Sequence, residues 1–197
     1  MKFIFLIYIS FLCAVTISAQ NVSLKKQKGF RYERFSDLDS LNIKDPDFKL
    51  IDIEFRVYYN SSAYDTLNHK FIQIVKNKNG LWSGKLYSYY YYNEDSYNFK
   101  DVIIEYLSLE NWDKTWQIIV EKNYINLPTE SDIKQANKPL VLVSGGHHYT
   151  IEVLTKKRKR RIYYGNPASK YESCPEYGLN CYEYEHFLQL IQLLDLW

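Results

Sequence analysis

The sequence predicts an α+β fold: a mostly antiparallel sheet of about six to eight strands, one mid-chain helix and one C-terminal amphipathic helix. Two observations predict the strands and the helices. Apolar and polar residues alternate from residue 48 onwards, as in half-buried strands. The spacing becomes helical between 108 and 123, and again from Tyr182. Because strands come in runs and each run is followed by a helix, α+β is favoured over a parallel α/β arrangement.

Residues 1–19 have the pattern of an export signal. Lys2 precedes an uncharged apolar run, and Ala19 is the small residue that a signal peptidase requires. An uncleaved membrane anchor is the alternative, but the run is shorter than the roughly 20 residues of a spanning helix. We therefore expect export to a periplasm or beyond the cell, no span in the mature chain, and a single α+β domain over 20–197. Its first part, 20–47, is expected to be a partly ordered leader.

The first run of strands is expected to form a meander. A brief alternation at 30–35 allows one strand within the leader. In 48–59 the alternation predicts one dry face and one wet face carrying Glu54 and Arg56. Polar breaks at 60–62 and 77–80 separate it from its neighbours, and the second contains a strong turn signal. The expected strands of this run are 48–59, 71–75, 81–92 and 102–109.

The second part of the chain mixes helices and strands. Trp112, Trp116 and Ile119 have helical spacing, and Ser108 is the expected N-cap. Thr129, followed by Asp132, predicts one short extra turn. Strands are expected at 140–143, 148–154 and 162–164, with turns at 145–146 and 156–161. The last helix begins near Tyr182, and its dry stripe contains Phe187, Leu190, Ile191, Leu194 and Trp197.

Two cysteines remain once Cys13 is removed with the signal. Cys174 and Cys181 are an even pair in an exported chain, which predicts a disulfide at the entry to the last helix. Because the loop is short, this bridge should contribute only about 2 kcal/mol of stability. A zinc site would need two further ligands that the sequence does not indicate, so no metal is predicted.

A basic run, 156–161, interrupts a nearly neutral chain. Without Lys2, 24 basic residues stand against 23 acidic ones, which disfavours a general binder of nucleic acid. The run is expected at a hairpin tip, where it is either a solvated turn or a docking point for phosphate, sulfate or an acidic partner. The residues assigned to this docking point are Lys156, Lys157, Arg158, Lys159 and Arg160.

The chain is rich in tyrosine, with twenty among 197 residues. Tyr87, Tyr89 and Tyr91 share one face of an expected strand, because alternate strand residues point the same way. If that face is exposed, its row of rings suits sugars or a protein partner. The alternative is ordinary half-buried strand tyrosines.

No motif names a reaction. His147, His148 and His186 form the best metal-binding set, but neighbouring strand histidines point apart and no HExxH spacing is present. No G-x-S-x-G elbow or glycine-rich phosphate loop occurs, and the glycines at 145–146 fit a hairpin turn. The sequence therefore indicates no catalytic residue, metal or cofactor.

These patterns favour a non-enzymatic binding protein that acts on a protein partner outside the cytoplasm. Two alternatives stay open: a glycan-binding protein that uses the tyrosine face, and an extracellular hydrolase whose carboxylates meet only in space. The ligand and the oligomeric state are not indicated.

Overall fold

A computed structural model describes residues 22–27, 30–61, 68–93, 96–133, 146–175 and 181–194. For residues 68, 90–93 and 96–101 it describes the backbone alone. The expected signal segment at 1–19, the expected strand at 140–143, Gly145 and Trp197 lie outside the described residues.

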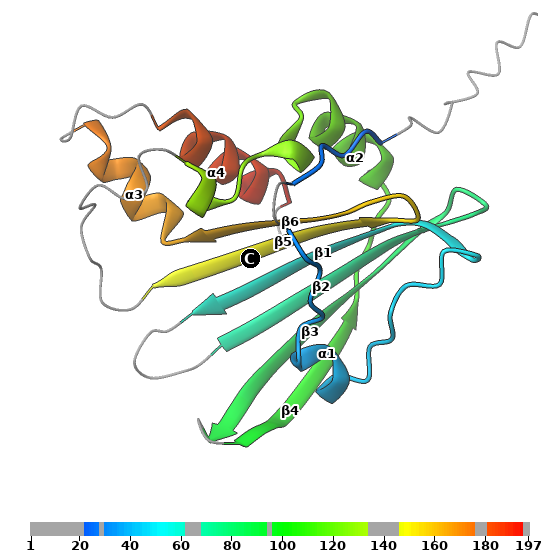
Figure 1. The fold of residues 1–197 in the computed structure, drawn as a ribbon. Helices are drawn as coiled ribbons and strands as arrows, with labels where there is room; N and C mark the ends of the chain where they lie inside the picture. Colours follow the sequence, from blue (N-terminus) through cyan, green and yellow to red (C-terminus); the bar gives the residue numbers. More distant parts are fainter. Residues whose placement is uncertain are drawn as a thin grey trace, which may run out of the picture.

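One antiparallel sheet of six strands forms the centre of the protein, which confirms the α+β prediction (Figure 1). The strand order is β4-β3-β2-β1-β5-β6. β1 lies in the middle, with β2 on one side and β5 on the other. The strands are β1 (Ile51–Ser61), β2 (Asn68–Asn77), β3 (Trp82–Asn93), β4 (Ser96–Tyr106), β5 (His147–Thr155) and β6 (Lys159–Gly165).

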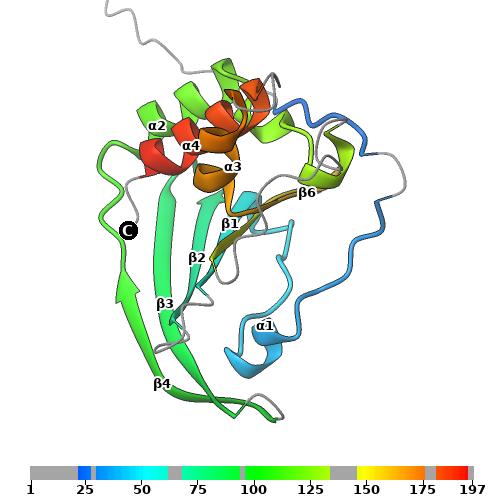
Figure 2. The same cartoon turned by 90° about the vertical axis from the view of Figure 1, so that its left-hand side faces the viewer.

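Among the described elements, the longer helices cover one face of the sheet and one short helix lies on the other (Figures 1 and 2). The first group contains α2 (Trp112–Glu121), α3 (Pro167–Ser173) and α4 (Tyr182–Leu194), and the short helix is α1 (Asp37–Ser40). Two single 3-10 turns, η1 (Tyr124–Asn126) and η2 (Glu130–Asp132), follow α2. The second of these confirms the expected extra turn.

Three local predictions were wrong. The strand expected at 30–35 is absent, because that stretch runs as irregular chain across the sheet. The cap of α2 is Asn111 instead of Ser108, because the chain reaches helical geometry only after a turn at 110–111. The basic run is not one six-residue turn, because β6 begins at Lys159.

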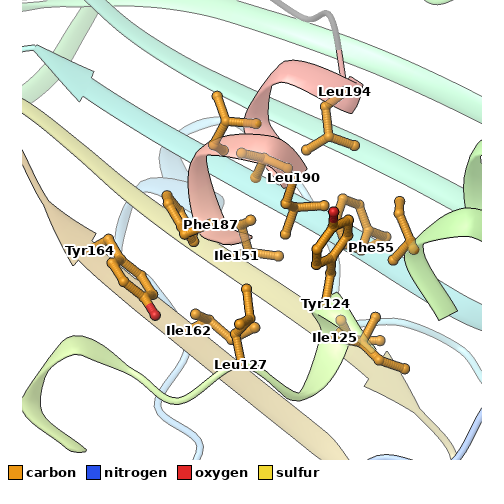
Figure 3. Packing of buried hydrophobic residues seen from close by; sticks show 14 of the residues in the cluster. Phe55, Tyr124, Ile125, Leu127, Ile151, Ile162, Tyr164, Phe187, Leu190 and Leu194 are labelled. Atoms are coloured by element: carbon orange, nitrogen blue, oxygen red, sulfur yellow. The ribbon is translucent and has the colours of Figure 1, made fainter. Parts of the chain in front are cut away.

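The main core lies between the sheet and the helical layer, with residues of α2 and α4 and with Cys174 at the end of α3. Figure 3 shows its part between the strands, residues 124–127 and α4. Phe55 is completely buried, and its ring centroid lies 6.2 Å from that of Trp112 and 5.9 Å from that of Trp116. On α4, the Phe187 ring stacks on Tyr164 of β6 at a centroid distance of 4.1 Å. These contacts fix α2 and α4 on the same face of the sheet.

The expected disulfide is present. Cys174, at the C-cap of α3, is bonded to Cys181, which directly precedes α4, and their Cα atoms are 6.1 Å apart. Both cysteines are buried in the main core. The bridge therefore holds the two helices together within the helical layer.

The leader is an integral part of the fold. Leu24 is buried in the main core, whereas Leu38, Leu41 and Ile43 are buried on the opposite face of the sheet. The chain therefore passes from one face to the other around the β6 side, and Figure 1 shows it descending across the sheet to α1. There it covers a second core that contains Tyr58, Phe71, Tyr87 and Tyr89.

Leu38→Ala should lower the free energy of unfolding by about 2 to 5 kcal/mol, because it leaves a cavity beneath α1. Leu38 is fully buried, whereas Leu50 is 67% exposed. Leu50→Ala is therefore the matched control and should change stability by less than about 0.5 kcal/mol. Urea unfolding of both variants measures the difference. Equal midpoints would mean that the leader does not pack on the sheet.

Candidate functional site

The two edges of the sheet differ. On the outer side of β6, the backbone N–H of Tyr163 donates to the Thr129 hydroxyl at 3.1 Å. The N–H of Arg161 donates to the side-chain oxygen of Gln27 at 3.3 Å. The leader and the segment before η2 therefore satisfy backbone groups that an edge strand leaves unpaired.

No described segment pairs with the outer side of β4 along its last five residues, 102–106, which we call the β4 edge. The N–H of Leu107 donates to the carbonyl of Gly84 at 3.0 Å. Because bonded and non-bonded pairs alternate in an antiparallel ladder, the N–H and C=O groups of Ile104 and Tyr106 face away from β3. Among the described residues, no hydrogen bond joins them to another segment.

The side chains of the β4 edge are apolar on both faces of the sheet. Ile103 is 55% exposed and Ile104 is 52% exposed, and neighbouring strand residues point to opposite faces. Tyr106 is 81% exposed, and the Lys85 ammonium lies 5.4 Å from its ring centroid. Natural edges usually carry charged side chains, proline or a covering segment that prevents pairing. Within 102–106 there is one charge, Glu105, and no lysine or proline, and no described segment is paired with this stretch.

The expected tyrosine face is not exposed. Tyr87 and Tyr89 keep only 5% and 2% of their surface accessible, so the premise of an exposed row was wrong for these two residues. The Tyr89 hydroxyl donates to a carboxylate oxygen of Asp37 in α1 at 3.0 Å. The leader covers this face, which the sequence did not indicate. The side chain of Tyr91 lies outside the described residues.

Much of the basic run binds the protein's own leader. The guanidinium of Arg158 donates to the carbonyl of Leu24, and the Lys159 ammonium lies 3.8 Å from the ring centroid of Tyr32. Arg160 is buried and donates to the carbonyl of Leu127 at 2.5 Å. Lys159 and Arg160 are therefore engaged within the chain, whereas Lys156, Lys157 and Arg158 are exposed.

A buried ionic cluster lies beneath the leader. Arg56 is fully buried, and its Nε donates to Glu54 at 2.6 Å. Its Nη1 lies 3.5 Å from Glu152 and 3.2 Å from the hydroxyl of Tyr32. Arg161 of β6 donates two further hydrogen bonds to Glu152, at 2.9 and 2.7 Å. The face of β1 that carries Glu54 and Arg56, which was expected to be exposed to solvent, is thus buried, because the leader covers it.

Burial and pairing oppose each other in this cluster. Burial alone lowers the pKa of Arg56, but the neighbouring Glu54 carboxylate, together with Tyr58 and Tyr32, more than offsets it, so the pKa is raised and the guanidinium stays charged. Burial raises the pKa of Glu152, and the cations of Arg161 and Arg56 compensate only in part. The cluster is therefore held by mutual pairing and depends on each member.

A hollow of about 320 Å³ opens next to this cluster. Glu54, Gln73, Lys85 and Tyr87 line it from the sheet, and residues 42–47 line it from the leader. Gln73 donates to the same oxygen of Glu54 that Arg56 binds, at 2.8 Å. The described hydrogen bonds of the Glu54 carboxylate thus remain within the protein.

The structure does not bring the histidines together. His147 Nδ1 lies 2.6 Å from the Tyr59 hydroxyl, and His148 Nδ1 lies 2.9 Å from that of Tyr163 on the opposite face. His186 belongs to α4, where its Nδ1 is 2.8 Å from the carbonyl of its own helix at Tyr182. No group of three His, Cys, Asp or Glu residues in the described part of the chain is placed to hold a metal ion.

Arg56→Met should lower the free energy of unfolding by about 3 to 5 kcal/mol at neutral pH, because it leaves buried carboxylates without their cation. It should also raise the pKa of Glu152 further above its unfolded value. The folded variant then binds a proton more tightly than the unfolded chain. Its loss of unfolding free energy, relative to the unchanged protein, should therefore become smaller as the pH falls from about 8 to about 5. Urea unfolding across this pH range is the measurement.

The matched control is Lys78→Met, which removes a cation from the exposed pair with Asp52. That change should alter stability by less than about 1 kcal/mol. A deficit for Arg56→Met that is equally small, or independent of pH, would contradict a buried ionic cluster.

Comparisons with known proteins do not assign the chain to a family. No protein-family model matches it, and no curated protein matches it. The geometry of the described residues is therefore the basis for inferring a function.

Proposed function

We propose that this chain is an exported binding protein that captures a protein partner by adding one of the partner's strands to β4. The main support for this proposal is the contrast between the edge of β6, which other segments cover, and the apolar β4 edge, which no described segment covers. The outward-facing N–H and C=O groups of Ile104 and Tyr106 can form hydrogen bonds with the backbone of another extended polypeptide. This property favours a protein over a glycan.

The side chains of the edge define the partner. A strand added to β4 places its alternate residues over Ile104 and Tyr106 on one face and over Ile103 on the other. The partner strand should therefore be apolar on both faces, with a lysine or arginine near Glu105. Apolar side chains as exposed as these commonly mark a recognition surface when they are contiguous.

Two further features support export. The N-terminal 19 residues have the composition of a signal. The disulfide between Cys174 and Cys181 is the kind of bond that persists in an oxidising compartment. No helix in the described ranges has the length and apolar character of a membrane span. Neither the glycan-binding nor the hydrolase alternative gains a comparable observation.

Ile104→Pro should abolish capture of the partner, because proline removes an N–H that faces outward and leaves the β3 ladder intact. Ile104→Thr keeps the N–H and should retain measurable binding. In the experiment, residues 20–197 are immobilised and exposed to envelope and secreted extracts of the same cell. A retained protein is then titrated against each variant, and amide exchange follows residues 102–106 in the complex.

Ile118→Lys is the control for apolar exposure, because Ile118 is 39% exposed on α2, away from the sheet edge. It should bind as the unchanged protein does, whereas Ile104→Lys should not. Equal binding by Ile104→Pro, or no new amide protection at 102–106 in the complex, would refute strand addition. Extracts that yield no retained protein would also count against it.

A further inference from the structure

A separate surface lies at the end of the sheet where β1 begins. In the strand register, Ile53 is opposite Thr155 of β5, and Ile51 is opposite Asn77 of β2. The β5–β6 hairpin and the β2–β3 turn therefore lie on either side of the residue before β1, Leu50. Figure 1 shows both loops at the same end of the sheet.

Exposed cations from two distant parts of the sequence meet there. Lys156, Lys157 and Arg158 form the tip of the β5–β6 hairpin. The carbonyl of Leu24 accepts a hydrogen bond from Arg158, and the next carbonyl of the leader lies 3.4 Å from Arg160. The leader's own lysines are thereby held beside the tip. The exposed cations are Lys25, Lys26, Lys156, Lys157 and Arg158, and neither 24–27 nor 155–158 contains an acidic residue.

Two exposed leucines occupy the same end. Leu50 and Leu81 are each 67% exposed. The carbonyl of Leu50 accepts from the N–H of Lys78 at 3.0 Å, and the carbonyl of Leu81 accepts from the N–H of Asn77, also at 3.0 Å. Both leucines are therefore hydrogen-bonded to the β2–β3 turn.

Four acidic residues lie near these leucines: Asp45 and Asp47 line the same hollow as Leu50, Asp52 is two residues further along the chain, and Asp113 accepts a hydrogen bond from the ring N–H of Trp82. Asp52 is paired with Lys78, and a carboxylate oxygen of Asp47 accepts from the N–H of Lys49 at 2.9 Å. Asp45 is paired with Arg34 and Asp113 with Lys76, whereas the five exposed cations form no ion pair with a described residue.

We propose that this end of the sheet docks on an anionic lipid surface. Leu50 and Leu81 would enter the boundary between headgroups and acyl chains, while the five cations bind lipid phosphates. A sulfated glycan would match the cations but offers the leucines no apolar phase. An acidic protein surface would match the cations and leave both leucines against polar groups. The combination of the two side-chain types therefore favours lipid.

The test uses residues 20–197, which contain every described residue and exclude the apolar signal segment. Flotation with phosphatidylcholine vesicles, with or without about 30% phosphatidylglycerol, measures partitioning. We expect binding to the anionic vesicles alone, weakened by salt. Lys156→Glu with Lys157→Glu should reduce the partition coefficient by at least about tenfold. Leu50→Ser with Leu81→Ser should reduce it severalfold at every salt concentration.

Matched controls carry the same changes elsewhere. Lys122→Glu reverses an exposed lysine at the C-cap of α2, for comparison with Lys156→Glu alone, and Ile103→Ser with Ile104→Ser removes apolar side chains from the β4 edge. Both should partition as the unchanged protein does. The proposal is overturned if the anionic vesicles do not bind, if the lysine control loses as much affinity, or if the leucine variant binds normally. The last outcome, together with binding to polyglutamate, would assign the surface to an acidic protein.

Discussion

The fold depends on one buried cation, the guanidinium of Arg56. A charge in the middle of a sheet face is tolerated only when it is paired and shielded from water. Glu54, on the same strand, supplies one partner and Glu152, on β5, supplies another. Tyr32 of the leader completes the set at 3.2 Å. The charge therefore couples the two central strands to the leader, because its partners come from all three parts.

The leader makes the two edges of the sheet different. The leader crosses the β6 side, where Gln27 satisfies a backbone group and Tyr32 lies under the ammonium of Lys159. It then buries Tyr87 and Tyr89 beneath α1. No described segment pairs with the outer side of β4 at 102–106. The same element that closes one edge and one face of the sheet thus leaves the other edge available for pairing.

Local patterns in the sequence predicted most of the strands, the helices α2 and α4, and the disulfide. They could not show what lies against each face. The alternation of Glu54 and Arg56 with apolar residues distinguishes two faces, but a buried ion pair and a solvated one give the same pattern. A helix as short as α3 (Pro167–Ser173) completes too few turns to show a helical period. The position of β4 at an edge was equally hidden, because strand order depends on the pairing of β1 with β5 across 90 or so residues.

The two proposed surfaces are neighbours, and they can be occupied at the same time. Tyr106 is opposite Lys85, four residues along β3 from Leu81. A strand rises about 3.4 Å per residue, so the near end of the β4 edge lies about 14 Å from the lipid-facing turn. A partner strand on β4 would start close to the bilayer surface and run away from it along the sheet. The sheet would then hold its partner at a fixed distance from the membrane. This arrangement requires β4 to lie at the edge of the sheet, because only an edge strand can pair with a partner strand.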